Sequence, residues 1–453
     1  MRLFRRARGY ARGLVAFLVG LLLVQLVNAC SAGPQAGGRT RLTIATVNNG
    51  DMVIMQNLSS RFEADNPDIE LNWVVLEENI LRQRTTTDVA SQGGQFDVLT
   101  IGSYETPIWA RRGWLRSLDG LPAEYDVDDL LDPIRTGLSY EDTLYAVPFY
   151  GESSMLYYRT DLFEKAGITV PENPTYEQVG EWAKQVNDPA NGVYGICLRG
   201  KPGWGENMGF ISTLVNTFGG RWFDMDWNPT INTPAWQNAI SFYVDLMNQY
   251  GPPGASSNGF NENLALFSTG KCGMWVDATV AAGLLSNPDE SQVADRIGFA
   301  RAPVESYDNG SNWLWAWSLA IPSTSQSPEA AERFVAWATS KEYIQLVAEE
   351  HGWVAAPPGT RKSTYANPEY QAAAPFAEIV LNSIQSADIT NPSSEPTPYK
   401  GIQYVDIPEF QAIGTQVGQR MAAALADNLS VDQAIEKSQT VAERFMRHTG
   451  YIE

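Results

Sequence analysis

The chain has 453 residues, a formal net charge of −20 and 44% hydrophobic residues. This length and apolar content suffice for two or more domains with large cores. The acidic surplus excludes nucleic acid as a partner, because a surface of that sign repels phosphates.

Residues 1–29 are predicted to be an export signal. Five arginines precede a mostly apolar run, Leu14–Val27, which is short for a membrane span, and Ala29-Cys30 resembles a bacterial lipobox. We expect lipidation of Cys30, with residues 30–40 as a tether that links the anchor to the fold. The alternative is an ordinary signal, cleaved near Ala29 or Ala32. Loss of the signal shifts the charge to −25, because its five arginines are removed.

Strands and helices alternate in the first third of the chain. Strands are predicted over 41–48, 69–76 and 96–101, with helices over 52–66 and 80–91 between them. This order predicts a mainly parallel sheet with helices on its faces, and ligands of such sheets lie beyond the carboxyl ends of the strands. The polar residues at that edge are Asn48, Asn49, Asp51, Glu77, Glu78, Asn79, Ser103, Tyr104 and Glu105.

The middle of the chain has the pattern of a second unit. Two extended segments, 145–150 and 155–159, meet at Gly151 and read as a crossover between lobes, with Glu152 beside it. A helix capped by Thr175 follows, then a short strand over 194–198, a turn-rich loop over 199–207, a helix over 234–249 and a strand over 271–277. Cys197 and Cys272 are either one disulfide or two buried thiols.

In the stretch Asn312–Pro322, three tryptophans stand at every second position. In a strand, Trp313, Trp315 and Trp317 share one face, which fits either a core strand or a platform for a sugar or polyol. We expect Trp313 or Trp315 to contact a ligand and Trp317 to belong to the core. Helices are predicted over 329–339, from about 340, over 406–426 and over 431–446.

The motifs of common catalytic and metal sites are missing from the sequence. There are two histidines, far apart, and no HExxH, CxxC or GxSxG pattern. A calcium-like start at Asp224 lacks the glycine and glutamate that complete such a loop. We therefore expect no metal, no cofactor and no enzymatic activity.

Several long blocks resemble one family. The segments 45–57, 149–155, 195–207, 216–226 and 251–279 are similar to the sorbitol/mannitol-binding proteins of ABC transporters, within the family 1 extracellular solute-binding proteins. The resemblance implies the type II periplasmic-binding-protein fold, with two α/β lobes and a ligand cleft between them. The first lobe would comprise 41–151 plus about 318–352, and the second 152–312 plus about 353–453. Hinges would lie near 151–155, 312–318 and 352–356.

The resemblance also implies a function and a site. The chain would be a monomer outside the membrane or in the periplasm, held to the membrane only through its lipid, and would deliver a sugar alcohol or related sugar to ABC permease subunits. An exported carbohydrate-active enzyme or a sugar sensor on the same fold is the alternative. The expected ligand-binding residues are Asn49, Asp51, Arg82, Tyr104, Glu105, Glu152, Lys201, Trp204, Glu206, Trp275, Asp277, Trp313, Trp315 and Trp353.

Overall fold

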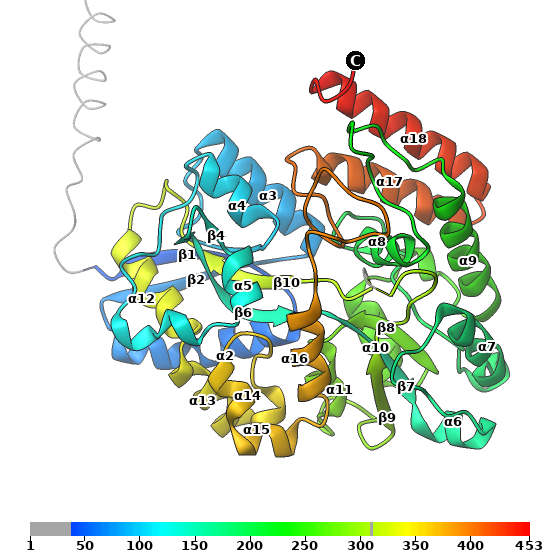
Figure 1. Cartoon of the computed structure of the whole chain (residues 1–453). Helices are drawn as coiled ribbons and strands as arrows, with labels where there is room; N and C mark the ends of the chain where they lie inside the picture. Colours follow the sequence, from blue (N-terminus) through cyan, green and yellow to red (C-terminus); the bar gives the residue numbers. More distant parts are fainter. Residues whose placement is uncertain (1–37, 309–310) are drawn as a thin grey trace, which may run out of the picture.

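The computed structural model describes residues 38–308 and 311–453 (Figure 1). The predicted signal, Cys30 and most of the predicted tether lie outside these residues. Within the described ranges, no helix combines the length and apolar character needed to cross a membrane.

A five-stranded sheet forms the centre of the first lobe. Its strand order is β2-β1-β3-β10-β6, with β1 parallel to both β2 and β3, and β10 antiparallel to β3 and β6. The start of β10 therefore lies at the edge where the other four strands end. The strands are β1 (Thr40–Val47), β2 (Ile69–Leu76), β3 (Val98–Gly102), β6 (Ala146–Glu152) and β10 (Trp315–Ala320).

Helices cover this sheet and complete the first core. In α2 (Gly50–Asp65), Met52, Met55 and Phe62 recur at helical spacing and are buried. The Phe62 ring packs edge-on against Phe334, with ring centroids 5.3 Å apart. The predicted β-α-β-α-β order is thus confirmed. The other helices on this side are α3 (Glu78–Ser91), α4 (Glu105–Arg111), α5 (Asp132–Gly137), α12 (Pro328–Ala338) and α13 (Lys341–His351).

The second lobe is built on a smaller sheet. Strand β7 (Ser154–Arg159) pairs antiparallel with β8 (Met274–Ala278) and with β9 (Ile297–Arg301). Thr175 caps α7 through a reciprocal capping box with Gln178, as predicted. The helices around this sheet are α6 (Thr160–Ala166), α7 (Tyr176–Val186), α8 (Asn207–Thr217), α9 (Pro234–Tyr250), α10 (Phe260–Ser268), α11 (Ala281–Ser286), α17 (Phe410–Leu425) and α18 (Val431–His448).

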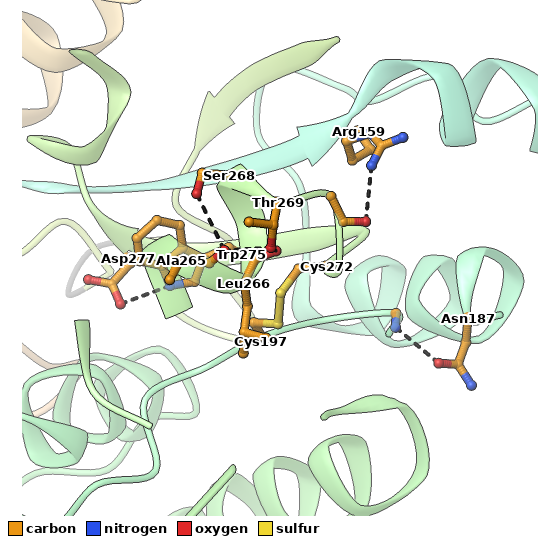
Figure 2. Close-up of a disulfide and its surroundings, with 12 residues drawn as sticks. Arg159, Asn187, Cys197, Ala265, Leu266, Ser268, Thr269, Cys272, Trp275 and Asp277 are labelled. Atoms are coloured by element: carbon orange, nitrogen blue, oxygen red, sulfur yellow. Dashed lines mark hydrogen bonds between the residues drawn. A yellow bond between two sulfur atoms is a disulfide. The ribbon is translucent and has the colours of Figure 1, made fainter. Parts of the chain in front are cut away.

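The strand expected over 194–198 does not form. Tyr194 and Cys197 make isolated bridges to Cys272 and Trp275, while the Ile196 amide donates to the Tyr250 carbonyl 3.3 Å away. That hydrogen bond to the end of α9 interrupts the ladder. A disulfide between Cys197 and Cys272, with their Cα atoms 5.9 Å apart, ties this segment to the start of β8 (Figure 2).

The lobes are joined at three places. Strand β6 runs into β7 through Ser153, and residues 311–314 lead into β10. Residues 358–363 still contact the first lobe: the Gly151 amide donates to Pro358, the Leu131 amide donates to Thr360, and the Arg361 guanidinium donates to Thr339. Residues 353–355, near the expected crossing at 352–356, lie against α11 of the second lobe as well as α13 of the first. Helices α14 (Lys362–Ala366), α15 (Pro368–Ala373) and α16 (Ala377–Ser386) precede the passage to α17 (Figure 1).

Candidate functional site

A cavity lies between the two lobes. Its lining comes from the carboxyl edge of the first sheet on one side and from loops and helix starts of the second lobe on the other. The lining residues are Asn49, Glu78, Arg82, Tyr150, Glu152, Arg199, Trp204, Gly205, Gly209, Phe260, Val280, Trp313, Trp315, Trp317 and Gln403.

Strand pairing brings the first-lobe residues together. Trp315 pairs with Glu152 across the β10–β6 ladder, so the first indole of β10 lies beside the last residue of β6. Asn49 follows β1 at the same edge, and its Nδ2 donates to the Tyr150 hydroxyl at 2.8 Å. Topology alone thus places polar groups and an aromatic wall side by side.

Arg82 lies at the centre of the aromatic wall. Its guanidinium carbon is 4.2 Å from the Trp204 ring, 4.8 Å from Trp315 and 4.7 Å from Trp317. Its nitrogens pair with Glu78 at 3.0 Å and with Glu105 at 2.8 Å. The indoles therefore surround a paired cation, and the Trp204 contact joins the second lobe to the first.

In the second lobe, Arg199 is a buried arginine paired with a carboxylate, as Arg82 is in the first lobe. Its Nη2 is 2.6 Å from Asp277 Oδ1, and its Nε donates to Oδ2 at 2.9 Å. Trp275 Nε1 donates to the same carboxylate at 3.0 Å (Figure 2). Nearby, the guanidinium lies 5.7 Å from the Trp313 ring. Arg199 borders the cavity already neutralised, with Asp277 and Trp275 behind it.

Glu152 is the acidic residue of the lining whose side chain the described residues leave without a partner. Its side chain is buried, and no hydrogen bond or ion pair from the described residues reaches its carboxylate. Burial raises the pKa of Glu152 to about 8, and the nearby Asp277, Glu78 and Asp51 add to this rise while Arg199 opposes it. Without a partner the Glu152 carboxyl group stays largely protonated at neutral pH, and hydrogen-bond donors from a molecule inside the cavity would favour its charged form.

Trp313 offers the complementary group. Its Nε1 is buried and has no hydrogen-bond partner among the described residues. Trp313 and Glu152 thus both border the cavity, and the described residues supply no partner for the Trp313 Nε1 or for the Glu152 carboxyl group. A ligand with both donors and acceptors, such as a hydroxyl-rich molecule, would satisfy the two.

The structure separates the predicted residues into those that border the cavity and those that do not. Asn49, Arg82, Glu152, Trp204, Trp313 and Trp315 border it. Glu105 and Asp277 lie behind the arginines that they hold. The Tyr104 ring packs at a tilt against Trp204, with centroids 4.6 Å apart, and its hydroxyl donates to the Ile407 carbonyl.

Four more expected residues lie away from the cavity lining. Lys201 is at the rim, where its Nζ is 2.5 Å from Glu77 and 3.3 Å from Glu206. Burial raises the pKa of Glu206, and repulsion from Glu78 adds to the rise. Asp51 is buried in the first turn of α2, and burial raises its pKa to about 7. Trp353 Nε1 donates to Glu369, in a short segment that contacts α13, α15 and α11.

The structure also places Trp275, Trp353 and Trp317 relative to the cavity. Trp275 is fully buried behind Asp277, and Trp353 is held by Glu369, so neither borders the cavity. Trp317, expected in the core, belongs to the buried core and also borders the cavity. The Arg82 guanidinium contacts the rings of both Trp315 and Trp317.

Sequence reasoning missed several residues of the lining. Tyr150, Arg199, Phe260, Val280 and Gln403 come from segments far apart in the chain. Gly205 and Gly209 carry no side chain that a motif could reveal. For Arg199, the sequence held one sign of a place in the site, since this arginine begins the turn-rich loop 199–207. Glu78 was predicted at the carboxyl edge of the first sheet, although it was not among the expected ligand-binding residues.

Comparison with known proteins places the chain in a family. Residues 48–345 match the family described as bacterial extracellular solute-binding protein. Over 427 residues the chain is 56% identical to a protein named mannitol-binding protein from Pseudomonas aeruginosa, covering 94% of this chain and 98% of that one.

Solved structures agree with this placement. An ABC transporter solute-binding protein from Agrobacterium vitis S4, with bound D-mannitol, is 59% identical and has a TM-score of 0.91, over 91% of this chain and 100% of that one. Another solute-binding protein, from Agrobacterium radiobacter K84 and in complex with ribitol, is 25% identical with a TM-score of 0.79, over 90% of this chain and 99% of that one. The predicted type II periplasmic-binding-protein fold is confirmed, and the chain belongs to the bacterial extracellular solute-binding proteins.

Proposed function

We propose that this ABC solute-binding protein captures a hexitol, such as D-mannitol or sorbitol, in the cavity between its lobes. The observation that carries the proposal is the unpaired Glu152 carboxylate, buried beside indoles in an interlobe cavity. Polyol hydroxyls donate to such a carboxylate, while indole rings cover the C–H faces between the hydroxyls. The free Nε1 of Trp313 supplies a donor for a hydroxyl oxygen.

The charges of the site favour a neutral ligand. Both arginines of the lining are already neutralised, Arg82 by Glu78 and Glu105, and Arg199 by Asp277. A sugar phosphate or carboxylate would bring its charge close to Glu152 without a free cation to balance it. A quaternary ammonium ligand would need an aromatic cage, and Arg82 occupies the one formed by Trp204, Trp315 and Trp317.

The relatives support the same ligand class. The mannitol-binding protein is 56% identical over almost the whole chain, and the Agrobacterium vitis protein, with D-mannitol bound, is 59% identical. The ribitol complex, at 25% identity, extends the comparison to a shorter polyol. An acyclic polyol therefore fits both the chemistry of the cavity and the ligands of these proteins.

We further propose that the lobes close over the ligand and that a membrane permease recognises the closed form. Hinges near 151–155 and 312–318 fit the passages between the two sheets, and we propose a third passage between α15 and α17 in place of 352–356, because α16 packs on β7 and β9 as well as on β6. The protein would act as a monomer. Lipidation of Cys30 would hold the protein at the membrane. The variant Cys30→Ala should therefore move the protein from the membrane fraction to the soluble fraction.

A thermal-shift screen followed by calorimetric titration tests the ligand. The panel contains D-mannitol, sorbitol, xylitol, erythritol, glucose, maltose and mannitol 1-phosphate. We expect the hexitols to raise Tm most, because a bound ligand stabilises only the folded state, and to bind with micromolar or tighter Kd. Mannitol 1-phosphate should leave Tm unchanged, because the cavity offers no free cation for its charge. No shift with any polyol or sugar would overturn the proposal, and release of reducing ends from oligosaccharides would favour an enzyme instead.

A further inference from the structure

Gly209 differs from the other glycines beside the cavity. It is the third residue of α8, it is buried, and it borders the cavity. A Cβ added to Gly209 would meet no atom within 4 Å, apart from its own helix backbone and chain neighbours. By contrast, a Cβ on Gly205 would lie 2.7 Å from Glu78 Oε1. The empty space beside Gly209 is therefore the cavity itself.

Nothing within the described residues requires a glycine at this position. The backbone of Gly209 is not in the left-handed region, and the surrounding atoms leave room for a methyl group. Glycine is among the least favourable residues in a helix, and alanine is the most favourable. A buried helical glycine with free space at its Cβ position is explained if another molecule fills that space.

We infer that the ligand lies directly against the Gly209 backbone, so that Gly209 sets the size of the ligand that the closed cavity accepts. This inference rests on the proposed polyol function. A methyl group at Gly209 would occupy roughly the room of one carbon of a polyol chain. An alanine there should reject a six-carbon polyol and still accept a four-carbon one.

The test compares Gly209→Ala with a matched variant, Gly180→Ala. Gly180 lies in α7, away from the cavity lining, and its added Cβ would make an ordinary contact 3.5 Å from Phe242. Both substitutions put alanine into a helix, so the ligand-free Tm of each should equal or exceed that of the wild type. D-Mannitol and erythritol are titrated into all three proteins by calorimetry.

We expect Gly209→Ala to weaken D-mannitol binding about 10- to 100-fold, because one extra carbon group costs that much in a closely fitting pocket. Erythritol binding should change less than about threefold, and Gly180→Ala should bind both as the wild type does. If the wild type binds mannitol and Gly209→Ala binds it equally well, the inference is overturned and the proposed function stands. Equal loss of both polyols, or a lower ligand-free Tm, would also overturn it. If the wild type binds no polyol, the inference and the proposed function both fail.

Discussion

Glu152 is a buried acid at the junction of the lobes, where β6 gives way to β7. Its neighbours in the lining, Arg82 and Arg199, are saturated by other carboxylates. The protein thus places one acceptor in the cavity and leaves it for the ligand. Burial without a partner disfavours the charged form, which is why the pKa of Glu152 rises to about 8.

Replacing Glu152 by glutamine should weaken hexitol binding. The amide keeps the size of the side chain but removes the charge, and a hydrogen bond to a charged group contributes about 1.5–3 kcal/mol. We expect the Kd for D-mannitol to rise about 10- to 100-fold at alkaline pH, measured by calorimetric titration. Glu164→Gln, at an exposed position on α6, is the control and should bind normally. Unchanged affinity in Glu152→Gln would show that the carboxylate makes no bond to the ligand.

The loop 199–207 and helix α3 are the elements that meet when the lobes come together. Arg82 of α3 packs on Trp204, and Asn79 donates to the Pro202 carbonyl at 3.4 Å. At the outer end of this contact, Lys201 pairs with Glu77. The absence of a side chain at Gly205 allows the loop to approach this closely.

Gly205→Ala should hinder closure. The added Cβ would lie 2.7 Å from Glu78 Oε1 and 2.8 Å from Arg82 Nη2, and those atoms are held by their ion pairs. We expect about tenfold weaker ligand binding and, by small-angle scattering, a ligand-saturated form more expanded than the wild type. The ligand-free Tm should stay within a few degrees, because the contact crosses the lobes. Wild-type affinity and full compaction on ligand addition would contradict this prediction.

The disulfide stabilises the second lobe by linking two segments separated by 75 residues. Cross-linking reduces the entropy of the unfolded chain, and losing a native disulfide typically costs about 2–5 kcal/mol. Reduction, or the double variant Cys197→Ala/Cys272→Ala, should lower the free energy of unfolding by that amount in denaturant titrations. Reducing agent should have no effect on the double variant. An unchanged unfolding midpoint after verified reduction would contradict the expected contribution.

At the scale of the molecule, several acidic side chains are buried near the boundary of the two lobes. Glu152, Asp51 and Glu206 all have raised pKa values because of burial. The two lobes each contribute to this acidic interior, Asp51 from the first and Glu206 from the second. Closing the ligand-free protein therefore requires desolvating carboxylates or protonating them.

Ligand-free closure should depend on pH. Opening hydrates Glu152 and returns its pKa toward the ordinary 4.5, whereas closure raises it to about 8. The closed form therefore binds the proton more tightly, so closure is favoured at acid pH and is lost as the pH rises from about 4.5 to about 8. Small-angle scattering without ligand should give a smaller radius of gyration at about pH 5.5 than at about pH 8.5. Glu152→Gln should weaken this dependence, and equal radii of the wild type at both pH values would contradict it.

The sequence by itself determined the local elements and one edge of the site. The spacing of apolar residues identified β1, α2, β2, α3 and β3. This is possible because apolar residues recur every second position in a half-buried strand and every three or four positions in a half-buried helix. Strand order then placed Asn49, Glu78 and Glu105 at the carboxyl edge, since parallel strands end together. Glu152 followed from its position at the first crossover.

The tertiary structure alone decided which residues face the cavity. Strand β10 enters the sheet between β3 and β6, and the direction of that pairing turns Trp315 and Trp317 toward Arg82. Local periodicity placed the tryptophans on one face but could not show that Trp313 lies near Arg199 of the other lobe. Contacts between distant segments leave no trace in local spacing, and Gly209, which has no side chain, acquires meaning only from the space beside it.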